Sequence, residues 1–326
     1  MKFIDLFAGV GGFHYGLEKS GKKFNCVWAN EWDKYAGQIY QKRFPETPFN
    51  PNSITDIDAK DIPEHELLVG GFPCQAFSLA GKRKGFEETR GTLFFEIIRI
   101  AKEKRPRLLL LENVKGLLSH DKGRTFAVIL NALDEIGYNV EWEVLNSKNF
   151  GVPQNRERVF IIGHLRGKSF RKIFPLGQND KKDNKQNSRL KQICNINPSG
   201  NGQSGNVYSI NGITPTINAL GGGRGAKTGL YSIPEITSHS PRTNNPKLGG
   251  SGPLRSNKHC FTIDRSPHIV NRIRRLTPVE CERLQGFPDG WTKELSDSQR
   301  YKCMGNAVTT KVVQTIGEKI LQKWSD

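Results

Sequence analysis

Cys74 is the residue of this sequence with the clearest capacity for chemistry. It lies on a Gly/Pro turn in the stretch GGFPCQAFS, directly behind Pro73 and just after the apolar run Leu67–Val69. A free thiol has a pKa of about 8.5, which a nearby cation or a helix N-terminus lowers. Pro73 restricts the backbone before the thiol and can aim it out of the turn. A buried, inert cysteine is the alternative, so the local context leaves reaction and packing both open.

Glu112 and two arginines offer acid and cation chemistry. Glu112, in LLLLENVKG, ends the most apolar strand of the chain. Its carboxyl should be partly desolvated and its pKa raised, as a proton donor near neutral pH requires. Arg156 and Arg158, in QNRERVFIIG, share one face if their strand begins early, and guanidinium groups can hold a carbonyl oxygen or a phosphate. The alternatives are a chain-reversing cap for Glu112 and solvated charges at a strand entrance for the arginines.

A glycine-rich turn predicts a nucleoside site. DLFAGVGG (Asp5–Gly12) follows the first apolar run and opens a helix. Glu31 ends the next strand about 20 residues on, where an acidic side chain meets the ribose hydroxyls of a bound nucleoside. The glycines read GVGG rather than GxGxxG, so S-adenosylmethionine fits better than a dinucleotide. Trp32 could stack on an adenine or face a sulfonium, and a core aromatic is the alternative for it.

Strands and helices must position these residues, and the two alternate along the first half of the chain. This rhythm predicts the α/β class, with an open, mostly parallel, Rossmann-like sheet covered on both faces. Ligands of such sheets bind at the carboxyl ends of the strands, where the residues above lie. The predicted strands are Lys2–Phe7, Phe24–Asn30, Leu67–Gly70, Arg107–Leu111, Val140–Leu145 and Val159–His164. The predicted helices are Phe13–Lys19, Lys34–Phe44, Thr92–Lys104, Arg124–Ile136, Thr277–Gln285 with the cap TPVE, and Thr309–Trp324. The last of these should pack back onto the first domain.

A strongly basic segment interrupts this pattern. The chain has a net charge of +17, and between His164 and Arg275 there are 19 Lys and Arg against 4 Asp and Glu, a net charge of +15. Gly, Asn, Ser, Pro and Lys dominate there, with short β-like runs at Val207–Ile210, Thr216–Ala219 and Cys260–Ile263. We therefore predict a second, smaller, loop- and β-rich domain that grips a polyanion. A basic surface kept only for solubility is the alternative.

Cysteine spacing and hydropathy indicate the compartment in which the protein is expected to act. The six cysteines form no CxxC pair, which predicts reduced thiols and no metal site. No apolar run approaches membrane-spanning length, and the sequence opens with MKFIDLFAG rather than a cleavable signal pattern. We therefore expect a soluble cytoplasmic protein without a membrane partner.

Taken together, these segments resemble the DNA (cytosine-C5) methyltransferases of bacterial restriction–modification systems and phages. FxGxGG, ENV, QxRxR, RRLTPVECERLQGFP and GNAV occur in the family's order around GFPCQAFS, and the resemblance covers essentially the whole chain. It implies the class I S-adenosylmethionine-dependent methyltransferase fold. It also implies a catalytic domain at 1–166 and 272–326 and a target-recognition domain at 167–271.

The resemblance implies roles at the matched positions. Cys74 would be the nucleophile that adds to C6 of cytosine, and Glu112 the acid that contacts N3 and the exocyclic amine. Arg158, supported by Arg156, would contact the base O2. Because C6 cannot be reached inside a duplex, the base must flip out, and Gln203 would fill the gap. The implied cofactor-binding residues are Phe7, Val10, Gly12, Glu31, Trp32, Ser53, Ile54, Pro73, Leu93, Asn306 and Val308. The implied DNA-binding residues are Ser78, Lys82, Arg90, Gln203, Thr216, Gly222 and Gly223.

The sequence departs from the family pattern in three places. An Asp-Ile pair is usual at the adenine site, where NSITDID places Ser53 and Ile54, so either Ser53 makes the contact or Asp56 reaches in. Ala80 stands where some relatives carry a serine. The stretch Ser232–Asn271 is longer than in compact relatives and should enlarge the DNA-reading surface.

The sequence thus predicts a DNA (cytosine-5)-methyltransferase with S-adenosylmethionine as cofactor and double-stranded DNA as partner. We expect it to act as a monomer, in phage protection or beside a companion restriction endonuclease. A tRNA cytosine-C5 methyltransferase built on the same motifs is the main alternative. A non-catalytic DNA-binding protein with a relic methyltransferase fold conflicts with the intact Cys/Glu/Arg set. A NAD- or flavin-dependent oxidoreductase leaves the PCQ and ENV motifs and the basic segment unexplained.

Overall fold

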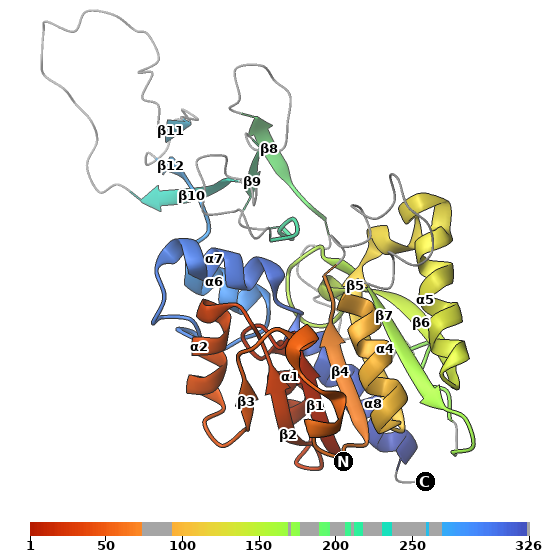
Figure 1. Cartoon of the computed structure of the whole chain (residues 1–326). Helices are drawn as coiled ribbons and strands as arrows, with labels where there is room; N and C mark the ends of the chain where they lie inside the picture. The colour runs from red at the N-terminus through yellow and green to blue at the C-terminus, as the bar shows by residue number, and fades with distance from the viewer. Residues whose placement is uncertain are drawn as a thin grey trace, which may run out of the picture.

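The structure of this protein is a computed structural model, shown in Figure 1. It describes residues 1–73, 93–168, 171–176, 189–195, 206–209, 212–217, 230–236, 259–260 and 269–324. Among these residues, no helix combines the length and the hydropathy that crossing a membrane would require.

A seven-stranded sheet forms the centre of the larger part of the molecule. Its strand order is β3-β2-β1-β4-β5-β7-β6, and β3, β2, β1, β4 and β5 run parallel, whereas β7 is antiparallel to both of its neighbours. Four consecutive leucines of β5 are buried, because a central strand of such a sheet is covered on both faces. The strands are β1 (Lys2–Leu6), β2 (Asn25–Asn30), β3 (Phe49–Asn50), β4 (Leu67–Gly71), β5 (Leu108–Val114), β6 (Tyr138–Asn146) and β7 (Glu157–Leu165).

Helices cover both faces of this sheet. One face packs against α4, α5 and the short 3-10 turns η1 and η2, and the other against α1 and the C-terminal α8. A third apolar cluster joins the glycine-rich loop between β1 and α1, together with α2, α6 and α7, to Tyr208, Ile217 and Tyr231. The helices are α1 (Gly12–Ser20), α2 (Lys34–Arg43), α4 (Leu93–Lys104), α5 (Arg124–Glu135), α6 (Pro278–Leu284), α7 (Asp297–Asn306) and α8 (Thr310–Trp324). The 3-10 turns are η1 (Ile54–Asp56), η2 (Ala59–Asp61), η4 (Lys115–Leu118), η5 (His120–Gly123) and η6 (Ser147–Asn149).

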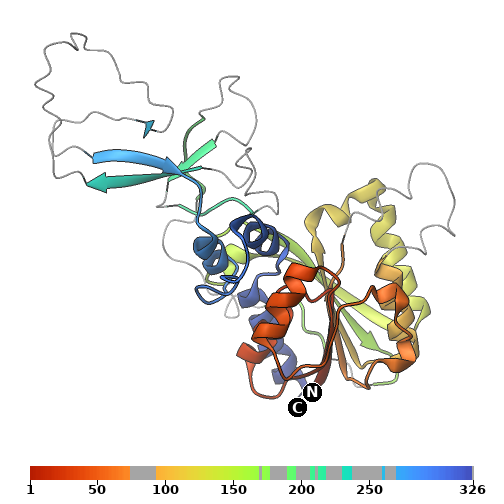
Figure 2. The same ribbon diagram turned by 60° about the vertical axis from the view of Figure 1, so that its left-hand side comes forward.

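A second, five-stranded sheet has the order β11-β12-β10-β9-β8. Figures 1 and 2 show it beyond the carboxyl ends of the parallel strands, next to α6 and α7. Its strands β10 and β9 are parallel, and its other pairs are antiparallel. The strands are β8 (Gln192–Asn195), β9 (Asn206–Ser209), β10 (Leu230–Ile236), β11 (His259–Cys260) and β12 (Ile269–Arg274). The last strand therefore continues past 271, the expected end of the recognition domain.

The sequence expectation of an α/β fold with a mostly parallel sheet is confirmed. Each of the six predicted strands and six predicted helices lies within a few residues of its expected bounds, and α8 packs on α1 as expected. Two expectations were wrong. Glu112 lies inside β5, which continues to Val114, and the described part of the Thr216–Ala219 run is not a strand. Helix α7 was not predicted.

Candidate active site

Glu112 and Arg158 form an ion pair at the carboxyl edge of the sheet. They lie on the adjacent antiparallel strands β5 and β7, and Arg158 Nε is 3.1 Å from Glu112 Oε1. The two side chains are only 12% and 14% exposed, respectively, so the pair is nearly removed from solvent but still reachable. Burial raises the pKa of Glu112, and the charges of Arg158 and Arg156 oppose that rise without cancelling it. Glu112 therefore holds a proton more readily than an exposed glutamate, as the sequence predicted.

Arg156 lies beside this pair but faces the protein interior. It precedes the first residue of β7 and is 2% exposed, so the alternative of a solvated charge was wrong for it. Its Nη2 donates to the carbonyls of Gly305 and Ala307, at 3.0 and 2.9 Å, and Nη1 donates to the carbonyl of Ile217 at 3.2 Å. Burial, together with the charge of Arg158, lowers the pKa of Arg156 to about 9. Arg156 thus ties β7 to the end of α7 and to the 212–217 segment.

The chain that leads to Cys74 passes directly beside Glu112. Gly71 pairs with Glu112 across β4 and β5, and a Cβ added at Gly71 would lie 3.2 Å from Glu112 Oε2. Asn113 Nδ2 donates to the carbonyl of Phe72 at 2.8 Å and so fixes the backbone two residues before Cys74. The sequence placed Asn113 beside Glu112 at the carboxyl edge of the sheet, within the ENV motif, but indicated no separate role for it. The predicted residues Cys74, Ser78, Lys82, Arg90, Gln203, Gly222 and Gly223, and the departure at Ala80, lie outside the described residues.

Glu31 closes the glycine-rich loop between β1 and α1. The loop turns sharply, with positive φ at Phe7, Gly9 and Gly11. Glu31 Oε2 accepts from the Gly9 amide at 2.8 Å, and its Oε1 accepts from the Asp33 amide at 2.7 Å. Burial raises the pKa of Glu31, and these amide bonds counter part of that rise. The predicted acidic side chain therefore lies against the loop, as the spacing in the sequence indicated.

The open side of this loop is next to Gly9. A Cβ at Gly9 would meet nothing nearer than the Phe7 carbonyl, 4.0 Å away, whereas a Cβ at Gly11 would lie 2.3 Å from the Phe44 ring. Trp32 is 73% exposed, so the alternative of a core aromatic was wrong. Open backbone, a carboxylate and an uncovered aromatic face are the groups that a nucleoside cofactor needs, so these residues fit one.

The residues predicted to contact the adenine form a short hydrogen-bonded chain. Ser53 Oγ lies 2.7 Å from Thr55 Oγ1, which donates to Asp56 Oδ1 at 3.1 Å. Ile54 between them is buried, and Arg99 donates to its carbonyl at 3.0 Å. Ser53 and Asp56 thus lie at the two ends of one hydrogen-bonded chain.

The other predicted cofactor residues lie on several elements. Val10 and Val308 are buried, and a Cβ at Gly12 would lie 2.7 Å from Val308 Cγ1, so this side of the loop is packed shut. Asn306, the last residue of α7, is exposed. Phe7 and Leu93 are partly buried against the same apolar cluster, and Pro73 is exposed at the end of its described segment.

Thr216, predicted to contact DNA, is engaged with the protein backbone. Its Oγ1 donates to the Asn155 carbonyl at 2.7 Å, and the neighbouring Ile217 amide donates to Gln154 Oε1 at 3.2 Å. Gln154 in turn donates from Nε2 to the carbonyl of Leu284 in α6 at 2.9 Å. The 212–217 segment is thereby held against the large domain.

The fold and this site together define a class of protein. It is an α/β domain with a glycine-rich loop that fits a nucleoside and a glutamate–arginine ion pair at the same edge of its sheet. A family model described as C-5 cytosine-specific DNA methylase matches residues 1–322. The chain belongs to this family, and it is a DNA cytosine-5 methyltransferase.

Individual relatives agree with this assignment. The chain is 38% identical over 348 residues to the type II methyltransferase M.HhaI of Haemophilus parahaemolyticus, covering 98% of this chain and 94% of that protein. It is 41% identical over 336 residues to M.SsoII of Shigella sonnei, covering 98% and 80%. Among solved structures, Dnmt2 of S. pombe superposes with a TM-score of 0.68 at 18% identity, covering 100% of this chain and 99% of that one. At that identity the superposition supports the fold alone. The family predicted from the sequence motifs is confirmed.

Proposed function

We propose that this methyltransferase transfers a methyl group from S-adenosylmethionine to C5 of a cytosine flipped out of duplex DNA. The observation that carries the proposal is the Glu112–Arg158 pair, which lies one strand away from the chain leading to Cys74. The large domain, 1–166 and 272–326, would perform the chemistry, and 167–271 would recognise the target. The glycine-rich loop, Glu31 and Trp32 would hold the cofactor, which supplies an electrophilic methyl group when bound.

Cys74 would act first. C5 of cytosine is a poor nucleophile, so addition of the thiolate to C6 divides one difficult step into two easier ones. A bond forms between Sγ and C6, and the electron pair of the C5–C6 double bond moves to C5. After methylation, loss of the C5 proton restores that double bond and expels the thiolate.

Glu112 and Arg158 would make the ring receptive to this attack. A protonated Glu112 can donate to N3 and accept from the exocyclic amine, which draws electron density away from C6. Its burial favours the protonated form that this contact needs. Arg158, already 3.1 Å from that carboxyl, would reach the base O2 and keep Glu112 in place. Arg156 would hold the start of β7, and with it Arg158, in place through its bonds to the carbonyls of Gly305 and Ala307.

Base flipping is part of this proposal. The Glu112–Arg158 pair joins strands β5 and β7 of the large domain, and the second sheet, β8 to β12, lies beyond the same edge. Duplex DNA held there would have to expose a single base to reach Glu112. Gln203 would fill the gap, Gly222 and Gly223 would belong to a turn that contacts phosphate, and Ser78, Lys82 and Arg90 would contact the DNA backbone. We expect a monomer in the cytoplasm, beside a companion restriction endonuclease or in phage protection.

Radiolabelled S-adenosylmethionine incubated with the protein and mixed-sequence plasmid DNA tests the proposal. We expect label in DNA as 5-methylcytosine and none with Cys74→Ser, which should still bind DNA. Label in tRNA but not in DNA would support the alternative of a tRNA methyltransferase. Undiminished transfer by Cys74→Ser would contradict the assigned nucleophile. DNA with 5-fluorocytosine at the methylated position should trap a covalent complex, because fluorine cannot leave as a cation.

A further inference from the structure

Trp291, in the segment that follows α6, contacts Val10 of the glycine-rich loop, 281 positions earlier in the sequence. Trp291 Nε1 donates to the carbonyl of Val10 at 2.9 Å. The indole is 7% exposed and Val10 is 1% exposed, so neither group has water as a substitute partner. Leaving a buried carbonyl without a donor lowers the stability of the fold by more than a typical hydrogen bond adds to it.

This bond fixes one peptide of the loop at both of its polar ends. The carbonyl of Val10 accepts from Trp291, and the amide of the same peptide, at Gly11, donates to the Ala8 carbonyl at 2.9 Å. Gly11 has a φ of +85°, a conformation that glycine adopts freely. Because glycine permits many conformations, the peptide needs external bonds to hold one of them.

The indole itself is held on several sides. Arg43 Nε donates to the Trp291 carbonyl at 2.9 Å, and the Arg43 guanidinium carbon lies 5.2 Å from the centre of the indole. The rings of Tyr15 and Phe287 lie 4.9 and 5.1 Å from it, centre to centre. Arg43 is the last residue of α2, so the indole connects the helix after β2 to the loop after β1.

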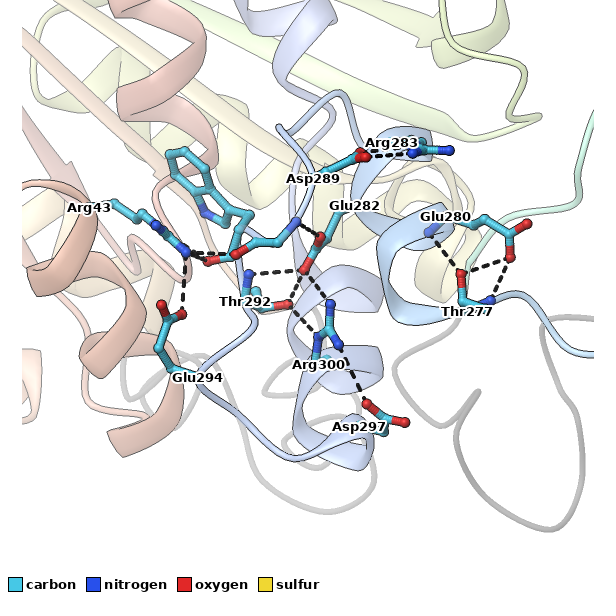
Figure 3. Close-up of polar contacts among 12 residues, drawn as sticks. Arg43, Thr277, Glu280, Glu282, Arg283, Asp289, Thr292, Glu294, Asp297 and Arg300 are labelled. Atoms are coloured by element: carbon cyan, nitrogen blue, oxygen red, sulfur yellow. Dashed lines mark hydrogen bonds and ion pairs between the residues drawn. The ribbon is translucent and has the colours of Figure 1, made fainter.

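The buried carboxylate of Glu282 holds the backbone on both sides of Trp291, and Figure 3 shows its contacts with Thr292 and Arg300. Glu282 accepts from the Gly290 amide at 2.7 Å, from the Thr292 amide at 2.9 Å and from the Thr292 hydroxyl at 2.5 Å. Arg300 Nη2 donates to the same carboxylate at 3.1 Å. Glu282 is fully buried, and these four donors satisfy it, so the turn that carries the indole has little freedom to move.

We propose that Trp291 is a positioning residue for the cofactor: through Val10 it holds the glycine-rich loop in the shape that binds S-adenosylmethionine. This inference rests on the proposed function, because it assumes that the cofactor binds at that loop. Trp291 acts through the loop and not on the reacting atoms. Its indole N–H should therefore influence the affinity for S-adenosylmethionine and leave the bound complex to react at the normal rate.

Trp291→Phe removes the N–H and retains an aromatic ring. We expect the Kd and the KM for S-adenosylmethionine to rise about 5- to 10-fold, with kcat within about twofold of the unmodified protein. Equilibrium dialysis of the full chain with labelled S-adenosylmethionine and steady-state kinetics on DNA measure these quantities. Trp142→Phe is the matched control, because Trp142 lies on the edge strand β6 and is 46% exposed, and it should change neither constant.

Arg43 donates to the carbonyls of both Trp291 and Gly290, at 2.9 and 2.8 Å. Arg43→Lys keeps the positive charge but loses this paired contact, so it should also raise the Kd. If Trp291→Phe does not fold, Arg43→Lys decides the question. An unchanged Kd in the folded variant would overturn the inference, as would a loss confined to kcat. If the unmodified protein bound no S-adenosylmethionine, the proposed function would fail instead, so the two failures are distinguishable.

Discussion

At the scale of single residues, the position of the Glu112 carboxyl depends on its neighbours on both adjacent strands. Arg158 approaches from β7, and Gly71 leaves room on the β4 side, where any Cβ would lie 3.2 Å from Oε2. Such a contact is tighter than an ordinary van der Waals contact, so the carboxyl would have to move by a few tenths of an ångström. The missing side chain at Gly71 therefore leaves the space that the Glu112 carboxyl occupies.

Gly71→Ala tests the importance of this space. We expect kcat for DNA methylation to fall about tenfold, because small displacements of a catalytic group are costly, while the melting temperature changes little. Gly116→Ala, just after the same ENV motif, is the control, since a Cβ there would have no neighbour within 4 Å. Equal loss of activity in both variants would mean that backbone freedom, and not the space beside Glu112, determines the effect.

Residue types alone indicated the catalytic candidates but not their surroundings. The apolar run Leu108–Leu111 was sufficient to predict a desolvated Glu112, and its pKa is indeed raised by burial. The roles of Gly71 and Asn113 could not be predicted, because they depend on the register between β4 and β5. That register is set by packing across the whole sheet, which no local pattern encodes.

At the scale of elements, the start of α6 could be predicted from local sequence, but its contact with the second sheet could not. The sequence TPVE predicted a capped helix start, and Thr277 and Glu280 form the complete capping box. Glu280 also accepts two 2.7 Å bonds from Arg274, the last residue of β12. The cap thus joins the second sheet to the large domain. Helix α7 was missed because its buried residues, Cys303–Gly305, are consecutive and form no apolar stripe.

The Glu280 carboxylate should make this junction sensitive to acid. Its hydrogen bonds with Arg274, its largest influence, lower the pKa of Glu280 from 4.5 to about 2. A depressed pKa contributes stability that is present above the unfolded value and lost as the pH falls from 4.5 toward 2. We expect Glu280→Gln to lower the free energy of unfolding by about 1 kcal/mol at pH 7, allowing for solvent screening. The difference should shrink below pH 4.5.

Urea denaturation between pH 7 and the lowest pH at which the chain remains folded measures this dependence. Asp289→Asn provides the control, because its partner Arg283 lies on the same helix as Glu280 and both side chains of that pair are largely exposed, so the pair should contribute less. A pH-independent difference for Glu280→Gln would show that the cap works through geometry and not through the charge of the carboxylate.

At the scale of the whole molecule, the contacts that complete the site come from distant parts of the chain. The alternation of strands and helices predicted the parallel sheet, but not the Trp291–Val10 bond or the contacts from Arg156 to the end of α7. These contacts connect positions more than a hundred residues apart, and several arrangements of the same helices would satisfy the local patterns. The charge distribution, in contrast, could be read directly, because a net charge does not depend on packing.

That distribution predicts how DNA binding responds to salt. The segment between His164 and Arg275 carries +15, and its strands β8, β9, β10, β11 and β12 lie beyond the carboxyl edge of the large sheet. This segment should therefore release most of the counterions when DNA binds. Arg189 and Lys191 are exposed beside β8, whereas Lys22 and Lys23 are exposed before β2, at the opposite end of the large domain. Replacing the first pair with Gln should reduce the slope of log K against log salt by about 1 to 2. Replacing the second pair should leave the slope unchanged, as fluorescence anisotropy with labelled duplex DNA can measure. Equal slopes in both double variants would mean that the basic region is not the surface that holds the DNA backbone.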